Sequence, residues 1–179
     1  FGAHGFVMVY HYLKTRGKEP ILPPMEHLPV VTIQLPVFNE FYVVDRLIEA
    51  VCSIEYPKDK LEVQVLDDST DETVEVVAKT VKHFQSLGYD IKHVYRTNRK
   101  GYKAGALKDG LESARGEFIA IFDADFVPNT TFLAQTLPYF FQDEKLALVQ
   151  TRWEHLNSDY SLLTRTQAMA LDAHFVMEQ

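Results

Sequence analysis

The stretch VVTIQLPVFNEFYVVDRLIEAVCSI, residues 30–54, changes its hydrophobic spacing part-way along. Its first part, residues 30–35, is a short apolar run rich in β-branched residues, which is typical of a buried strand. Its later apolar positions recur three and four residues apart, which is the spacing of a helix that buries one face. These positions are Val43, Val44, Leu47, Ile48, Val51 and Ile54. The stretch therefore predicts a strand followed directly by a helix.

The same alternation continues along the rest of the chain. Further strands are expected at residues 61–66, 91–95, 118–122 and 146–150. Further helices are expected at residues 74–84, 102–114, 130–141 and 161–179, with Pro138 disturbing the third of these. Ser69 and Glu72 have the spacing of a capping box, and Gly88 is placed to end the helix that follows them. Alternating strands and helices predict an α/β fold, a mostly parallel sheet covered by helices on both faces.

Polar residues follow each of the first four predicted strands. The four clusters are PVFNE at 36–40, DDST at 67–70, NRKGYKAG at 98–105 and DAD at 123–125. In open parallel sheets, ligands bind beyond the carboxyl ends of the strands. All four clusters are therefore expected at one edge of the sheet, around one site.

Asp123 and Asp125 follow a fully apolar strand and are one residue apart. In an extended chain such side chains point the same way. Two ionised carboxylates about 4 Å apart repel by roughly 4 kcal/mol at an effective dielectric near 20, so a cation is expected between them. Oxygen ligands suit Mg²⁺ or Mn²⁺ better than zinc. A lone D-x-D motif is weak evidence, because solvated turns often contain it, but the upstream DDST cluster strengthens it.

The other clusters have structural and functional explanations. Asp67 and Asp68 could cap the next helix, yet a cap needs one such residue, and a carboxylate can also accept an N–H of a nucleobase. An Asn and Glu after a strand, as at Glu40, often only start a helix. Lys103 lies in the first turn of a predicted helix, where a phosphate is favoured, although such lysines are usually solvated. Neither a P-loop nor a GxGxxG motif occurs in the sequence.

The motifs PVFNE, QVLDDSTD, NRKGYKAGAL, AIFDADFVP and LVQTRW, in this order, resemble the processive family 2 glycosyltransferases with a GT-A fold, near cellulose synthase. They look closest to the cellulose-synthase-like glucan and glucomannan synthases and their bacterial relatives. The resemblance covers residues 30–179 and implies a GT-A domain that is incomplete at its C-terminus. It implies an inverting β-glycosyltransferase that moves a hexose from a nucleotide sugar to a glycan or lipid acceptor. UDP-glucose is the favoured donor and GDP-mannose the second choice.

Six side chains match the donor-site motifs of that family: Glu40, Asp67, Asp68, Lys103, Asp123 and Asp125. By resemblance, the carboxylates after the first two strands contact the base and ribose, with the choice between the adjacent aspartates open. The lysine contacts the diphosphate, and the last two aspartates hold Mg²⁺ or Mn²⁺ and the sugar diphosphate. The family's general base belongs to a later motif, expected downstream of Gln179, so this N-terminal part is expected to be inactive alone.

The chain is expected to have three parts. Residues 1–14 read as the end of a transmembrane helix, because residues 1–13 are mostly apolar and Lys14, Arg16 and Lys18 follow them, as on the cytosolic side of a membrane span; an amphipathic or core helix is the alternative. Residues 15–29 read as a proline-rich linker, and residues 30–179 as the donor-binding part of the transferase domain. The resemblance places the full-length enzyme in a membrane as a multi-pass protein, with its catalytic domain in the cytoplasm.

Composition limits the other functions. The 179 residues are 46% hydrophobic, enough for one α/β domain, and the net charge of -7 argues against a nucleic-acid partner. Cys52 is the single cysteine, which excludes an internal disulfide. Two rival functions remain: a haloacid-dehalogenase-type phosphatase with Asp123 as nucleophile, and a non-catalytic nucleotide-sugar-binding module. The QTRW stretch at 150–153 either lines the acceptor region or packs Trp153 in the core.

Overall fold

The computed structural model describes residues 6–7, 10, 13–14, 25, 27–151 and 159–178. The chain divides into two compact units, Pro23–Gln142 on the one hand and Phe1–Leu22 with Asp143–Gln179 on the other. Most of the predicted membrane segment 1–14 and linker 15–29, together with Trp153, lie outside the described residues. Among the residues that are described, no helix combines the length and the apolar character needed to cross a membrane.

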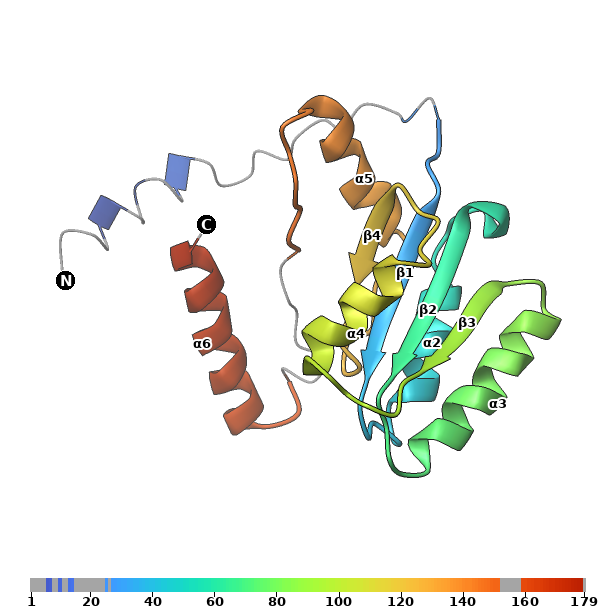
Figure 1. The fold of residues 1–179 in the computed structure, drawn as a ribbon. Helices are drawn as coiled ribbons and strands as arrows, with labels where there is room; N and C mark the ends of the chain where they lie inside the picture. Colours follow the sequence, from blue (N-terminus) through green and yellow to red (C-terminus); the bar gives the residue numbers. More distant parts are fainter. Residues whose placement is uncertain are drawn as a thin grey trace. The chain divides into compact units, whose positions relative to one another are not determined.

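The first unit is built on a parallel sheet of four strands in the order β3-β2-β1-β4. The strands are β1 (Val31–Val37), β2 (Leu61–Asp67), β3 (Asp90–Tyr95) and β4 (Phe118–Ile121). Val31 pairs with Leu61 on one side and with Phe118 on the other, which sets the register. Figure 1 shows the four arrowheads pointing toward the same end of the sheet, where the predicted polar clusters follow.

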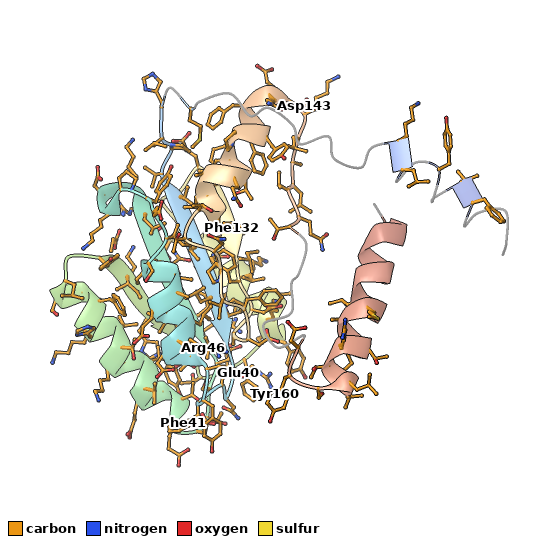
Figure 2. The ribbon with its side chains drawn as sticks, turned by 180° about the vertical axis from the view of Figure 1, so that it is seen from behind. Glu40, Phe41, Arg46, Phe132, Asp143 and Tyr160 are labelled. Carbon is orange, nitrogen blue, oxygen red and sulfur yellow. The ribbon has the colours of Figure 1, made fainter. Side chains whose placement is uncertain are left out.

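Helices cover both faces of this sheet. The helices α2 (Val44–Cys52), α3 (Thr73–Ser86) and α5 (Phe132–Gln142) lie on one face, and α4 (Tyr102–Leu111) lies on the other (Figures 1 and 2). After β3, at one edge of the sheet, the chain crosses back to place β4 beside β1. This connection runs in the opposite direction to those that join β1, β2 and β3, so a right-handed crossover places its helix, α4, on the other face of the sheet. A short 3₁₀ helix (Lys58–Lys60) leads into β2. The predicted α/β fold, a parallel sheet covered by helices on both faces, is confirmed.

The two faces of the sheet differ in chemistry. The face toward α2 and α3 is apolar and fully buried, with the strand residues Ile33, Leu35, Val63, Val65 and Ile91. The face under α4 carries buried polar side chains that bond across the strands. The Thr32 hydroxyl donates to Glu62 at 2.6 Å, and the Gln34 amide donates to Gln64 at 3.0 Å and to the Leu107 carbonyl of α4 at 3.4 Å. Every polar group in this row thus has a partner, as burial requires.

The ends of α3 test two local predictions. Gly88 has a φ of +82° just after the helix, and its N–H donates to the Gln85 carbonyl, so the predicted glycine stop is confirmed. The predicted capping box is wrong. The Ser69 hydroxyl instead accepts a hydrogen bond from the Asn39 N–H at 2.9 Å. The helix begins at Thr73, whose N–H donates to the Asp71 carboxylate at 3.0 Å.

The second unit contains α6 (Leu162–Glu178), which confirms the helix expected at 161–179. Ser161 caps it, since its hydroxyl accepts the Thr164 N–H at 3.1 Å. The fifth strand expected at residues 146–150 is wrong, because this stretch is irregular and Leu148 is 73% exposed. No strand in the described part of the chain pairs with residues 146–150. An apolar run forms a strand only when another strand pairs with it.

Candidate functional site

A cavity of about 440 Å³ lies at the carboxyl end of the sheet. Side chains that follow all four strands line it, and five of the six predicted residues are among them: Glu40, Asp68, Lys103, Asp123 and Asp125. The prediction that the four polar clusters meet at one edge is therefore confirmed. The sixth residue, Asp67, does not line the cavity.

The two aspartates of the DAD motif lie in a turn and not in the strand itself. The strand β4 ends at Ile121, and the Phe126 N–H closes the turn by donating to the Asp123 carbonyl at 3.0 Å. Phe122 and Ala124 are buried, and the centre of the Phe122 ring lies 4.8 Å from that of Phe132. Figure 2 labels Phe132 at the start of α5. The alternation of buried and outward residues thus continues through the turn, and both carboxylates line the same cavity.

The aspartate pair suits a hard divalent cation that takes further ligands from elsewhere. Asp123 forms an ion pair with Lys103, and Asp125 is exposed. The described part of the chain holds no cluster of three or more His, Cys, Asp or Glu side chains that could bind a metal. Two carboxylates are the usual protein contribution to Mg²⁺ sites that are completed by phosphate oxygens and water. The donor set therefore fits Mg²⁺ or Mn²⁺ in the presence of a phosphate ligand.

Asp68 is held by an arginine that the sequence analysis did not single out. The Arg96 Nε donates to Asp68 Oδ1 at 2.8 Å, and its Nη2 donates to Oδ2 at 2.6 Å. The two side chains are only 8% and 5% exposed. Arg96 also donates to Asp109 at 2.7 Å and to the carbonyls of Lys100 and Tyr102. The hydrogen bonds to Asp68 raise the pKa of Arg96 above its usual range. Through these contacts the guanidinium joins the end of β2 to the loop before α4.

Asp67 has a different environment from its neighbour. It is fully buried; its Oδ1 accepts the Ser69 N–H at 2.8 Å, and its Oδ2 lies 2.7 Å from His93 Nε2. Burial alone would raise the pKa of Asp67, but the hydrogen bonds from His93 and Ser69 lower it below its usual value. The adjacent aspartates therefore point into different surroundings, and Asp68 is the one beside the cavity.

Glu40 lies in the loop after β1, which is hydrogen-bonded to the loop after β2 through the adjacent residue, Asn39. The Asn39 N–H donates to Ser69, and the Asn39 side-chain oxygen accepts the Thr70 N–H at 2.9 Å. Asn39 has a φ of +57°, a conformation that asparagine tolerates better than most residues. Figure 2 shows Glu40 at the same end of the molecule as Phe41 and Arg46, around the start of α2. The loops after β1 and β2 thus form one connected rim.

The loop before α4 closes tightly on the helix that carries Lys103. A Cβ atom added to Gly105 would lie 1.9 Å from the Lys100 carbonyl oxygen, a distance that only glycine avoids. The Gly105 N–H donates to the Gly101 carbonyl at 2.9 Å. Gly105 is thus packed against the chain's own loop. The spacing of the KAG motif therefore sets where the lysine enters the cavity.

Comparisons with known proteins agree with this geometry. The profile described as "Glycosyl transferase family 2" matches residues 32–174. Glucomannan 4-beta-mannosyltransferase 9 of Arabidopsis thaliana is 48% identical over 155 residues, which are 84% of this chain and 29% of the relative. Glucomannan 4-beta-mannosyltransferase 1 of Cyamopsis tetragonoloba is also 48% identical, over 84% of this chain and 30% of the relative. The chain thus spans less than a third of the length of these curated relatives.

Solved structures share the fold. The mannosyltransferase PcManGT from Pyrobaculum calidifontis, in complex with GDP-Man and Mn²⁺, is 31% identical with a TM-score of 0.64. That match covers 77% of this chain and 41% of PcManGT. Staphylococcus aureus TarS residues 1–349 in complex with UDP are 20% identical with a TM-score of 0.54, over 70% of this chain and 39% of that one, a likeness of fold alone.

Proposed function

The chain belongs to glycosyl transferase family 2, and on that premise we propose that it binds the donor of a β-mannosyltransferase that extends a glucomannan-type glycan. The observation that carries this proposal is the meeting of Glu40, Asp68, Lys103, Asp123 and Asp125 in one cavity at the sheet edge. The sequence alone favoured UDP-glucose as donor. The mannosyltransferase relatives, and the solved relative with GDP-Man, support GDP-mannose instead.

Each cavity residue has a role that its surroundings support. Asp123 and Asp125 would hold Mg²⁺ or Mn²⁺, an ion that, when bound, neutralises charge on the departing diphosphate. Lys103 is the diphosphate contact, since its ammonium group lies at the cavity wall beside the aspartates that would hold the ion. Glu40 and Asp68 face the nucleoside, and the Arg96 contact fixes the direction of the Asp68 carboxylate.

The reaction is attack by a glycan hydroxyl on the anomeric carbon of the donor sugar, with inversion. Such an attack needs a base beside the acceptor hydroxyl. We assign the carboxylates of this cavity to donor binding and not to that role. The whole enzyme is proposed to work in a membrane, with this domain on the cytosolic side. Family membership argues against the phosphatase.

Calorimetric titration of the full-length protein with GDP-mannose and UDP-glucose, with and without Mn²⁺, tests the proposal. GDP-mannose is expected to bind in the presence of Mn²⁺ and to lose most of its affinity when the ion is chelated. Tighter binding of UDP-glucose would overturn the donor, and binding of neither sugar would overturn the function. Transfer of labelled mannose to a mannan oligosaccharide then separates an enzyme from a non-catalytic binding module.

A further inference from the structure

Arg99 lines the same cavity and has no anionic partner among the described residues. Its guanidinium carbon lies 3.2 Å from the centre of the Phe38 ring and 5.2 Å from that of Tyr102. Its Nε is buried and has no hydrogen-bond partner within the described part of the chain, while the residue as a whole is half-buried. A buried N–H group that has lost water without gaining an acceptor is costly, unless a ligand supplies that acceptor.

The other arginine and lysine of this region are already paired within the protein. Arg96 uses its donors on two carboxylates and two carbonyls, and Lys103 meets Asp123. Two carboxylates of the cavity wall, on Asp68 and Asp123, are thereby matched by charges of the chain itself. Arg99 is therefore the cation of this wall that has no carboxylate partner among the described residues.

The position of Arg99 is set before any ligand arrives. Its φ is +40°, in the left-handed region that a long side chain rarely adopts, and such outliers persist only where surrounding contacts fix them. Arg96 supplies those contacts by donating to the Lys100 and Tyr102 carbonyls. The Asn98 side chain accepts the Lys100 N–H at 3.1 Å. The loop on both sides of the arginine is thus held, and the ring of Phe38 holds its side chain.

Stacking leaves the edge of the guanidinium for a ligand. The face of the group rests on Phe38, while its N–H groups lie in the plane of the guanidinium. That planar fork matches two oxygens of a phosphate, and charge-assisted bonds of this kind are the stronger ones. We propose that Arg99 binds the diphosphate of the nucleotide-sugar donor, as a second cationic contact beside Lys103. This inference rests on the proposed function and adds a residue to it.

The test compares ligands that differ in their phosphates, using the full-length protein with Mn²⁺ and isothermal calorimetry. Arg99→Met keeps the length and the apolar stem of the side chain, and Arg99→Lys keeps the charge without the fork. Arg46→Met is the matched control, because Arg46 is an exposed arginine on α2 that does not line the cavity (Figure 2). GDP and guanosine are the two probes.

Arg99→Met is expected to weaken GDP binding roughly ten- to hundredfold, the range for losing a charge-assisted hydrogen bond, and to leave guanosine binding within about twofold. Arg99→Lys should recover part of the loss, and Arg46→Met should bind GDP like the wild type. Unchanged GDP affinity in both Arg99 variants overturns the inference, as does an equal loss for guanosine, which would indicate a base contact. Wild-type protein that binds no GDP would overturn the proposed function as well.

Discussion

Replacement of Arg96 by methionine isolates the ion pair on which the cavity wall depends. The variant keeps a long apolar stem but leaves the Asp68 carboxylate, 5% exposed, without its bidentate partner. Removing one member of a buried ion pair costs about 3–5 kcal/mol, because the remaining charge stays in a poorly solvated place. Against a typical stability of roughly 5–15 kcal/mol, that loss lowers the urea midpoint by a large fraction.

The same guanidinium offers an internal control. Its second carboxylate, on Asp109, is 52% exposed, so water can replace the lost contact. Asp109→Asn is therefore expected to cost only about 0–1 kcal/mol, as exposed pairs usually do. Urea unfolding followed by circular dichroism measures both variants, with an unchanged denaturant slope as the sign of a common unfolded state. The reasoning is refuted if Arg96→Met costs less than about 1 kcal/mol, or if Asp109→Asn costs as much as Arg96→Met.

Three further predictions concern charge, loop geometry and the lysine. Burial would raise the pKa of Glu62, but hydrogen bonds from Lys92, Thr32 and a backbone N–H lower it below its usual value. The ionised Glu62 therefore stabilises the fold fully above its unfolded pKa, and this contribution is lost as the pH falls through the lower folded pKa. Glu62→Gln should accordingly reduce the change in urea midpoint between neutral and acid pH. Gly105→Ala must move a carbonyl of the loop, so GDP affinity measured by calorimetry should fall; unchanged affinity would contradict that packing. Lys103→Met should weaken GDP binding about tenfold or more, whereas the exposed Lys108→Met should not.

The sheet and the cavity could be predicted because both follow from local spacing. Apolar runs and helical periods gave four strands and their helices, and the rule for parallel sheets then brought Glu40, Asp68, Lys103, Asp123 and Asp125 to one edge. No knowledge of distant pairing was needed for that step, because each cluster directly follows its own strand.

The predictions that failed, and the contacts that were missed, depend on residues far apart in the sequence. Ser69 has the spacing of a cap, but the loop after β1 takes its hydroxyl, and no local pattern shows that competition. The contact between Arg96 and Asp68 depends on the register of β2 with β3. One signal was available: two adjacent carboxylates at a buried strand end require a cation, and the next strand is followed by arginine. Arg99 was visible within NRKGYKAG, yet its stacking on Phe38 was not.

Manganese electron paramagnetic resonance tests the central claim most directly, because the signal of free Mn²⁺ falls when the ion binds. The account predicts that GDP and the wild-type protein together lower the free signal well below the level that GDP alone sets, and that the variant with both Asp123→Asn and Asp125→Asn leaves it at that level. Equal loss of the signal with the double variant would contradict a cation held between these carboxylates and the nucleotide diphosphate.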